Sequence, residues 1–258
     1  MHQRGELAEL SREHVEAILY ALRSAGHEVP AIDAAAYNED FLMTTHNADF
    51  QSDPRFVAAY TRGIRAVGGD YGFRWRVHVG LWAASCAIRL DGDFVECGVN
   101  RGFMSSAIMR YLDWNSRDRR FFLLDTFRGL DLELLTEDEK NLGKGTRTNT
   151  YEECFEEVQA NFSEFDNVVL IRGSVPGTLS EVDTEAVAYL HIDMNNVTPE
   201  IAAIEHFWPW LVPGAIVLLD DYGSPTYEAQ KEGMDEFASG HDVEILSLPT
   251  GQGMMVKA

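Results

Sequence analysis

Three aspartates directly follow, or close, two apolar and strand-like runs of the sequence. Asp193 closes 187-VAYLHID-193, and Asp220 and Asp221 close 214-GAIVLLDD-221. A carboxylate at the end of a buried strand is costly unless it is paired or binds a ligand. If the two strands are neighbours, the three carboxylates converge and repel one another, so they need a counter-charge. Alone, each acid would be read as a cap or a structural hydrogen-bond acceptor, but together they predict a Mg²⁺ site with oxygen ligands.

A turn rich in small residues follows an earlier strand-like run, in 96-ECGVNRG-102. An acid at the strand end and glycines that open a helix suit the close approach of a nucleotide-like ligand. The dinucleotide fingerprint G-x-G-x-x-G is not met, because Asn100 and Phe103 stand where its second and third glycines belong. The predicted cofactor contacts in this turn are Glu96, Gly98, Val99, Asn100 and Arg101.

The next two strand-like runs also end in polar or small residues. Asp125 closes 121-FFLLD-125 and is followed by Thr126, and an acid at this place can accept both hydroxyls of a ribose. Gly173 and Ser174 follow the third run and suit the edge of an adenine ring. The ordered set predicts an adenosine-bearing ligand without a pyrophosphate, such as S-adenosylmethionine.

The two predicted sites together suggest a reaction. A cation beside Asp193 would bind a substrate hydroxyl and lower its pKa, as metals do for water. It would also hold that oxygen in line with a sulfonium methyl group, so that positioning supplies much of the rate. Metal-assisted O-methyl transfer, with Asp193 as the catalytic metal ligand, is therefore a coherent interpretation of these residues.

From residue 91 to residue 258, apolar strand-like runs alternate with helix-like segments, which predicts an α/β fold with a parallel sheet covered on both faces. The predicted strands are 93–99, 121–127, 167–173, 187–193, 214–221, 242–248 and 253–258, and the predicted helices are 102–113, 151–163, 176–183 and 198–210. Only the short 249-PTGQG-253 separates the last two strands, so they should form an antiparallel hairpin. The polar stretch 130–150 interrupts the alternation and is either a lid or a disordered loop.

Residues 1–90 have a different pattern. Helical spacing predicts a helix over 5–25 and further helices over 55–89, with a break at Gly68–Gly69. Residues 38–54 show no clean period and are predicted to form a loop.

Composition limits the classes of function. The chain has 258 residues, 45% of them hydrophobic, and a formal net charge of −21, which disfavours nucleic acid and anionic membrane as main partners. Cys86, Cys97 and Cys154 form no CxxC pair, which indicates a reducing compartment. The amphipathic N-terminus does not resemble a signal peptide, and no apolar run approaches the roughly 20 residues needed to span a bilayer. We therefore expect a soluble, cytoplasmic protein.

Four motifs, 93-DFVECGVNRG-102, 122-FLLDTFRGL-130, 190-LHIDMN-195 and 212-VPGAIVLLDDYG-223, resemble those of the macrocin O-methyltransferase family. Members of this family are class I S-adenosylmethionine-dependent enzymes that methylate sugar hydroxyls of natural products such as macrolides and aminocoumarins. The likeness covers about residues 90 to 258 by the order and spacing of the motifs.

The resemblance implies a Rossmann-like, seven-stranded sheet of order 3-2-1-4-5-7-6, preceded by a helical segment and substrate lid in residues 1–90. It implies that Glu96, Gly98, Asp125 and Ser174 line the cofactor site, and that Asp193, Asp220 and Asp221 hold Mg²⁺. It also implies a small, glycosylated acceptor and a homo-oligomer.

One residue departs from the family pattern. Relatives with sugar substrates often carry D-G-D where this chain has 193-DMN-195, and the second acid is their proposed base. Asn195 cannot accept a proton at neutral pH, so another residue is the base, metal activation suffices, or the substrate differs. The alternative bases are His46, His78 and His191.

Two other functions stay open at this point. An NAD-dependent oxidoreductase would use the same fold, although the missing glycines speak against it. A non-catalytic binding module for S-adenosylmethionine would keep the fold and lack the base, as Asn195 suggests.

Overall fold

The computed structural model of the chain describes residues 17, 20–26, 36–147 and 151–258. They belong to two compact units, residues 1–49 and residues 50–258. In the first unit, β1 (Tyr37–Glu39) pairs antiparallel with β2 (Leu42–Thr44) through a tight turn at Asp40 and Phe41. The loop predicted over 38–54 therefore contains a hairpin, which three-residue strands are too short to reveal by alternation. The helix predicted over 5–25 falls largely outside the described residues.

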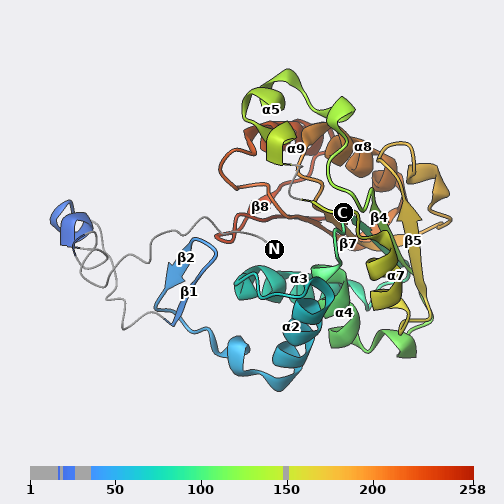
Figure 1. Cartoon of the computed structure of the whole chain (residues 1–258), viewed down its shortest axis with the longest axis horizontal. Coiled ribbons are helices and arrows are strands. Elements are labelled where there is room, and N and C mark those ends of the chain that lie inside the picture. Colours follow the sequence, from blue (N-terminus) through green and yellow to red (C-terminus); the bar gives the residue numbers. More distant parts are fainter. Residues whose placement is uncertain (1–16, 18–19, 27–35, 148–150) are drawn as a thin grey trace. The chain divides into compact units, whose positions relative to one another are not determined.

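The second unit is built on a seven-stranded sheet of order β5-β4-β3-β6-β7-β9-β8 (Figure 1). In chain order this is 3-2-1-4-5-7-6, as expected. The first five strands pair in parallel, and β9 runs antiparallel to both β7 and β8, which confirms the predicted hairpin. The strands are β3 (Asp93–Cys97), β4 (Phe121–Asp125), β5 (Val168–Arg172), β6 (Val187–Ile192), β7 (Leu211–Leu219), β8 (Leu246–Ser247) and β9 (Gly253–Val256).

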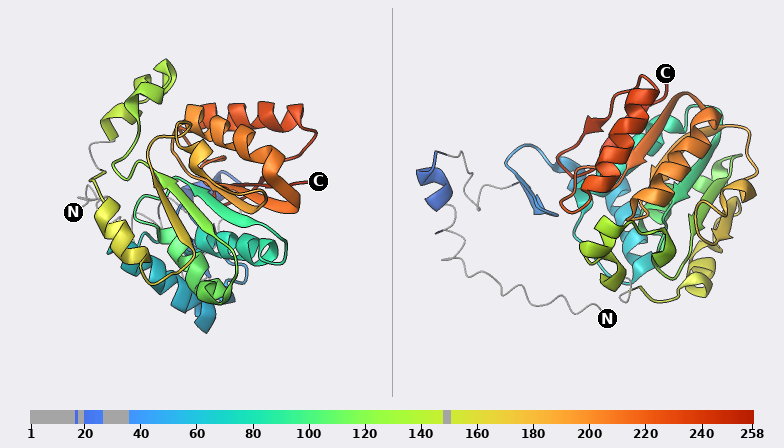
Figure 2. Two further views of the ribbon diagram at one scale, coloured as in Figure 1. Left: turned by 90° about the vertical axis from the view of Figure 1, so that its right-hand side faces the viewer. Right: turned by 90° about the horizontal axis from the view of Figure 1, so that it is seen from above.

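Helices cover both faces of this sheet, so its central strands are apolar on both sides (Figure 2). Phe94 and Tyr189 face one core, whereas the neighbouring Val95 and Leu190 face the other, as strand alternation requires. The first core is covered by α2 (Pro54–Val67), α3 (Arg74–Ala87), α4 (Phe103–Leu112) and α7 (Phe155–Phe162), and the second by α8 (Val197–Phe207) and α9 (Glu228–Gly240).

The helices predicted over 55–89 are α2 and α3, and the predicted break is where α2 ends. Gly68 caps α2 in the left-handed conformation, with φ of 74°. Both helices belong to the second unit, because α2 packs on α4 and α3 packs on α4 and β7. The boundary predicted at residue 90 therefore lies inside this unit, and the two units divide after Asp49.

Other segments differ from the sequence-based expectation. Residues 176–183 form only a short turn, η6 (Leu179–Glu181), because Pro176 and Gly177 disfavour a longer helix. The helix α9 was not predicted, because it has few apolar residues and two glycines and so shows no clear helical spacing of apolar residues. The described part of 130–150 is ordered into η4 (Leu132–Leu134), α5 (Glu137–Asn141) and α6 (Lys144–Arg147). The remaining short turns are η2 (Asp49–Ser52), η3 (Trp114–Ser116) and η7 (Trp208–Trp210). No helix among the described residues is both long and apolar enough to cross a bilayer.

Candidate active site

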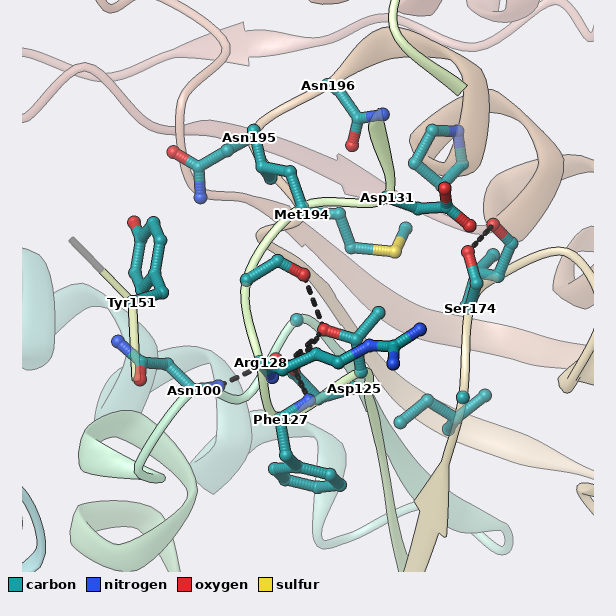
Figure 3. A pocket seen from close by; sticks show the side chains of 18 of the residues that line it. Asn100, Asp125, Phe127, Arg128, Asp131, Tyr151, Ser174, Met194, Asn195 and Asn196 are labelled. Carbon is teal, nitrogen blue, oxygen red and sulfur yellow. Dashed lines mark hydrogen bonds between the residues drawn. The ribbon is translucent and has the colours of Figure 1, made fainter. Parts of the chain in front are cut away.

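One pocket lies at the carboxyl ends of four parallel strands, β3 to β6 (Figure 3). Seven residues predicted from the sequence line it: Gly98, Asn100, Asp125, Thr126, Gly173, Ser174 and Asp193. Its other walls come from the segment after β4, including Arg128 and Leu134, and from Tyr151 and Met194. The topology thus brings together strand ends that are far apart in the sequence.

A second pocket shares Gly98, Asn100 and Asp193 with the first. The predicted residues Glu96, Val99 and Arg101 line this second pocket, as do Tyr71, Phe73, Arg76, Phe103, His191 and Asp220. Asp193 therefore borders both hollows.

Asp125 ties the end of β4 to the turn after β3. Its Oδ2 accepts hydrogen bonds from the backbone N–H groups of Val99 at 2.6 Å and Asn100 at 2.7 Å. Its Oδ1 accepts one from the N–H of Phe127 at 2.5 Å. A carboxylate has about four lone-pair sites, so Asp125 can hold this turn and still accept a ligand hydroxyl.

Gly98 is required by a close approach of two chain segments. Its φ is 91°, and a Cβ placed on it would lie 1.9 Å from the carbonyl oxygen of Asp193. The N–H of Asp193 donates to the carbonyl of Cys97 at 2.8 Å. The turn after β3 and the loop after β6 therefore pass against each other, and only glycine fits between them.

The acidic group beside the pockets differs from the predicted set. Among the described residues, His191, Asp193 and Asp220 offer ligand atoms within 4.8 Å of one another, and Asp221 lies outside this group. The Arg76 guanidinium lies 2.6 Å from Asp220 Oδ2 and 3.5 Å from Asp221 Oδ1. Part of the counter-charge therefore comes from α3, which no motif in the sequence indicated.

The acidic group still carries excess negative charge. Burial and the charges of Asp220 and Asp221 raise the pKa of Asp193 well above its ordinary value. Burial and the charge of Asp220 raise the pKa of Asp221 to about 6. Burial opposes ionisation of Asp220 too, but Arg76 and His191 outweigh it and hold the Asp220 pKa well below its usual range. Carboxylate oxygens that repel one another fit a hard divalent cation.

The three candidate histidines have different surroundings. His191 Nδ1 lies 2.8 Å from Glu96 Oε1. Burial lowers the pKa of His191, but Asp220 and Glu96 raise it to about 10, so the two carboxylates favour the charged form of the ring. His78 stacks on Phe50 at 4.1 Å between ring centroids and is not among the residues that line either pocket. His46 is exposed in the first unit.

Tyr151 and Arg76 are site residues that the sequence-based prediction missed. Tyr151 lines the first pocket, where burial and the charges of Asp193, Asp221 and Asp125 raise its pKa to about 12. Its phenol is therefore a proton donor at neutral pH. An isolated tyrosine in a polar stretch gives no sequence signal for such a role.

The chain matches the family model described as macrocin O-methyltransferase over residues 83–246. It is 26% identical over 215 residues to mycinamicin III 3''-O-methyltransferase of Micromonospora griseorubida, covering 74% of this chain and 82% of that protein. It is 29% identical over 145 residues to the 8-demethyl-8-(2,3-dimethoxy-alpha-L-rhamnosyl)-tetracenomycin-C 4'-O-methyltransferase of Streptomyces olivaceus, covering 52% of this chain and 54% of that protein.

Solved structures agree on the fold. The structure of the O-methyltransferase NovP superposes with a TM-score of 0.67 at 21% sequence identity, covering 82% of this chain and 100% of that chain. The calicheamicin methyltransferase CalS11 has a TM-score of 0.53 at 16% identity, covering 95% of this chain and 93% of that chain.

Proposed function

The chain belongs to the macrocin O-methyltransferase family, and on this premise we propose that it transfers a methyl group from S-adenosylmethionine to a sugar hydroxyl of a small glycosylated molecule, with the help of Mg²⁺. The observation that carries the proposal is the position of Asp193, which borders both the pocket at the strand ends and the pocket beside the acidic group. The name of one relative states 4'-O-methylation of a rhamnosyl tetracenomycin, and the name of another states 3''-O-methylation of mycinamicin III, which supports a glycosylated acceptor here.

In this proposal the first pocket holds S-adenosylmethionine. Asp125 would accept the ribose hydroxyls, and Gly173 and Ser174 would border the adenine. Gly98 would let the turn after β3 approach the ligand closely, as it already lets this turn approach the backbone of Asp193. When bound, the cofactor would supply an electrophilic methyl group, and the acceptor hydroxyl that receives it would give up its proton to water.

The acidic group would hold the cation. Asp193 and Asp220 offer carboxylate oxygens within 4.8 Å of each other, and Asp221 lies next to Asp220 with its pKa raised. A bound divalent cation would supply charge that lowers the pKa of an acceptor hydroxyl. Because the ring of His191 is held at Glu96, 2.8 Å from its Oε1, and Asn195 carries no acid, we propose that this lowering takes the place of a dedicated base.

The competing functions differ in what they bind. An oxidoreductase would bind NAD⁺ through a glycine fingerprint that Asn100 and Phe103 interrupt. A binding module would bind S-adenosylmethionine and transfer nothing. Assembly into a homo-oligomer stays a prediction.

A thermal-shift and transfer experiment tests the proposal. We expect S-adenosylmethionine to raise the melting temperature by several degrees at about 100 times its Kd, since ligand binding to the folded state stabilises it by about 2.7 kcal/mol at that concentration. NAD⁺ should give no shift. With rhamnosyl glycosides as acceptors, mass spectrometry should show products that have gained one methylene unit. Stabilisation by the cofactor without transfer to any glycoside would favour the binding module, and stabilisation by NAD⁺ alone would contradict the proposal.

A further inference from the structure

Lys144, in the segment between β4 and β5, is a buried cation. Its side chain on α6 is 3% exposed, a costly position for an ammonium group unless several partners surround it. Its Nζ donates to the carbonyl of Asn195 and to Gln230 Oε1, both at 3.0 Å, and to Glu139 Oε1 at 3.3 Å. It also lies 4.3 Å from the centroid of the Tyr227 ring. One side chain thus joins the α5–α6 segment, the loop after β6 and α9.

The partner carboxylate of Lys144 stabilises the same junction. Glu139 is fully buried, and its Oε1 also accepts the backbone N–H of Val197, the first residue of α8, at 2.9 Å. Its Oε2 accepts the backbone N–H of Thr136 at 3.0 Å. A single carboxylate therefore caps both α5 and α8, where the helix dipoles favour negative charge. The loop that precedes α8 is the one that carries Asp193.

Asn195 connects this junction to the acidic group. It adopts φ of 63°, and Lys144 holds its carbonyl. Its Oδ1 accepts the Tyr227 hydroxyl at 2.7 Å, and its Nδ2 donates to Asp193 Oδ1 at 3.3 Å. Both ends of the amide have a partner, so Asn195 links Tyr227 and Lys144 to the Asp193 carboxylate.

We propose that Lys144 is a positioning residue for the proposed methyl transfer. Through Asn195 it holds the loop Asp193–Asn196, and with it the Asp193 carboxylate, against the cofactor pocket. The segment that carries Lys144 also supplies Leu130, Asp131 and Leu134 to the pocket wall. In this view the described part of 130–150 is a fixed wall, joined to α9 by the buried hydrogen bond from Lys144 to Gln230. The inference rests on the proposed function.

The test must separate positioning from the cost of an unpaired buried charge. Lys144→Met alone leaves the Glu139 carboxylate buried without its cation and is expected to destabilise the fold. The double variant Lys144→Met with Glu139→Gln keeps the site neutral, and Glu139→Gln alone shows how much of any change comes from the altered acceptor at the Val197 N–H. Tyr227→Phe removes only the hydroxyl that holds the Asn195 amide. Lys140→Met is the matched control, because Lys140 lies in the same segment and pairs with Glu137 on the surface.

Three readouts apply to these variants: melting temperature, amide hydrogen exchange of residues 193–197, and S-adenosylhomocysteine affinity by calorimetry. We expect the double variant to melt close to the wild type, to exchange residues 193–197 at least about 10-fold faster, and to bind S-adenosylhomocysteine about 10-fold more weakly, the usual scale for lost support of a site residue. Tyr227→Phe should also speed the exchange of residues 193–197 and weaken S-adenosylhomocysteine binding, but by smaller factors. Lys140→Met should change neither the exchange nor the affinity.

Wild-type exchange and wild-type affinity in the double variant would overturn the inference. If the wild-type protein itself fails to bind S-adenosylhomocysteine, the proposed function fails, and the exchange of residues 193–197 still decides whether Lys144 holds the loop. If Lys144 only stabilised the fold, the double variant would melt at a lower temperature than the wild type. Its folded molecules would still bind S-adenosylhomocysteine with wild-type affinity.

Discussion

Replacing Asp193 with Asn is expected to lower the rate of methyl transfer about 10²- to 10³-fold, the usual scale for a group that stabilises developing charge at a reacting oxygen. Asn keeps the shape and the Oδ1 acceptor that Asn195 contacts, but it removes the negative charge proposed to hold the cation. The same substitution should leave the stability of the metal-free fold unchanged or increase it. Burial, Asp220 and Asp221 raise the pKa of Asp193, so its charge destabilises the metal-free fold at neutral pH, and a neutral residue removes that cost.

The expected signature of Asp193→Asn is therefore lost transfer with an unchanged or higher melting temperature, measured without added metal. Asp183→Asn serves as the matched control, because Asp183 is fully exposed and lines only a separate surface pocket near the opposite ends of the strands. A variant that keeps wild-type transfer would remove Asp193 from the mechanism. A variant that melts well below the wild type would instead show that the carboxylate stabilises the fold.

The second large effect is expected from Gly98→Ala. The added methyl group would meet the carbonyl oxygen of Asp193 at 1.9 Å, and the φ of 91° is itself unfavourable for alanine. The atoms that the methyl group would meet belong to the backbone and not to a flexible side chain. The loop after β6 must therefore move, or the fold must partly unfold. We expect the free energy of unfolding to fall by about 2 kcal/mol or more and S-adenosylmethionine binding to be lost.

Urea denaturation and calorimetry measure these two effects. Gly69→Ala is the matched control, because a Cβ at Gly69 meets no atom within 4 Å. Normal cofactor affinity in Gly98→Ala would show that the turn after β3 does not approach the ligand as proposed.

Much of the fold could be predicted from the sequence because buried parallel strands are nearly continuous apolar runs. Short apolar runs such as 121-FFLLD-125 are typical of buried strands, and this run forms β4. The strand order was expected from the resemblance to a family. The helix α9 could not be predicted in the same way, since it buries only a few apolar residues, among them Met234 and Phe237. Its amphipathic pattern is too weak to separate it from a loop.

The site was predictable only where the fold itself gathers the residues. The ends of parallel strands meet at one edge, so Asp125, Ser174 and Asp193 were expected to lie together, and they do. Asp193, Asp220 and Asp221 were expected to hold the cation together. Arg76 contacts both Asp220 and Asp221, but only Asp220 belongs with Asp193 to the group whose ligand atoms lie within 4.8 Å of one another.

Arg76 and Lys144 reach the site from elements that the sequence pattern does not connect to it. Arg76 contacts a residue 144 positions later in the chain, and Lys144 contacts one 86 positions later. Such contacts depend on how helices and loops pack over the sheet, which local periodicity does not encode. A need for counter-charge was predictable from the acids, but which cation meets it was not.

Removal and return of metal is the most direct test of the account. The protein would be treated with EDTA, supplied with S-adenosylmethionine carrying a labelled methyl group and with rhamnosyl glycosides, and assayed before and after Mg²⁺ is added in excess. We expect label transfer to be lost in EDTA and to return with Mg²⁺, while S-adenosylmethionine still binds in both states. Full transfer in EDTA would contradict the proposed mechanism, because methyl transfer would then need no cation beside Asp193.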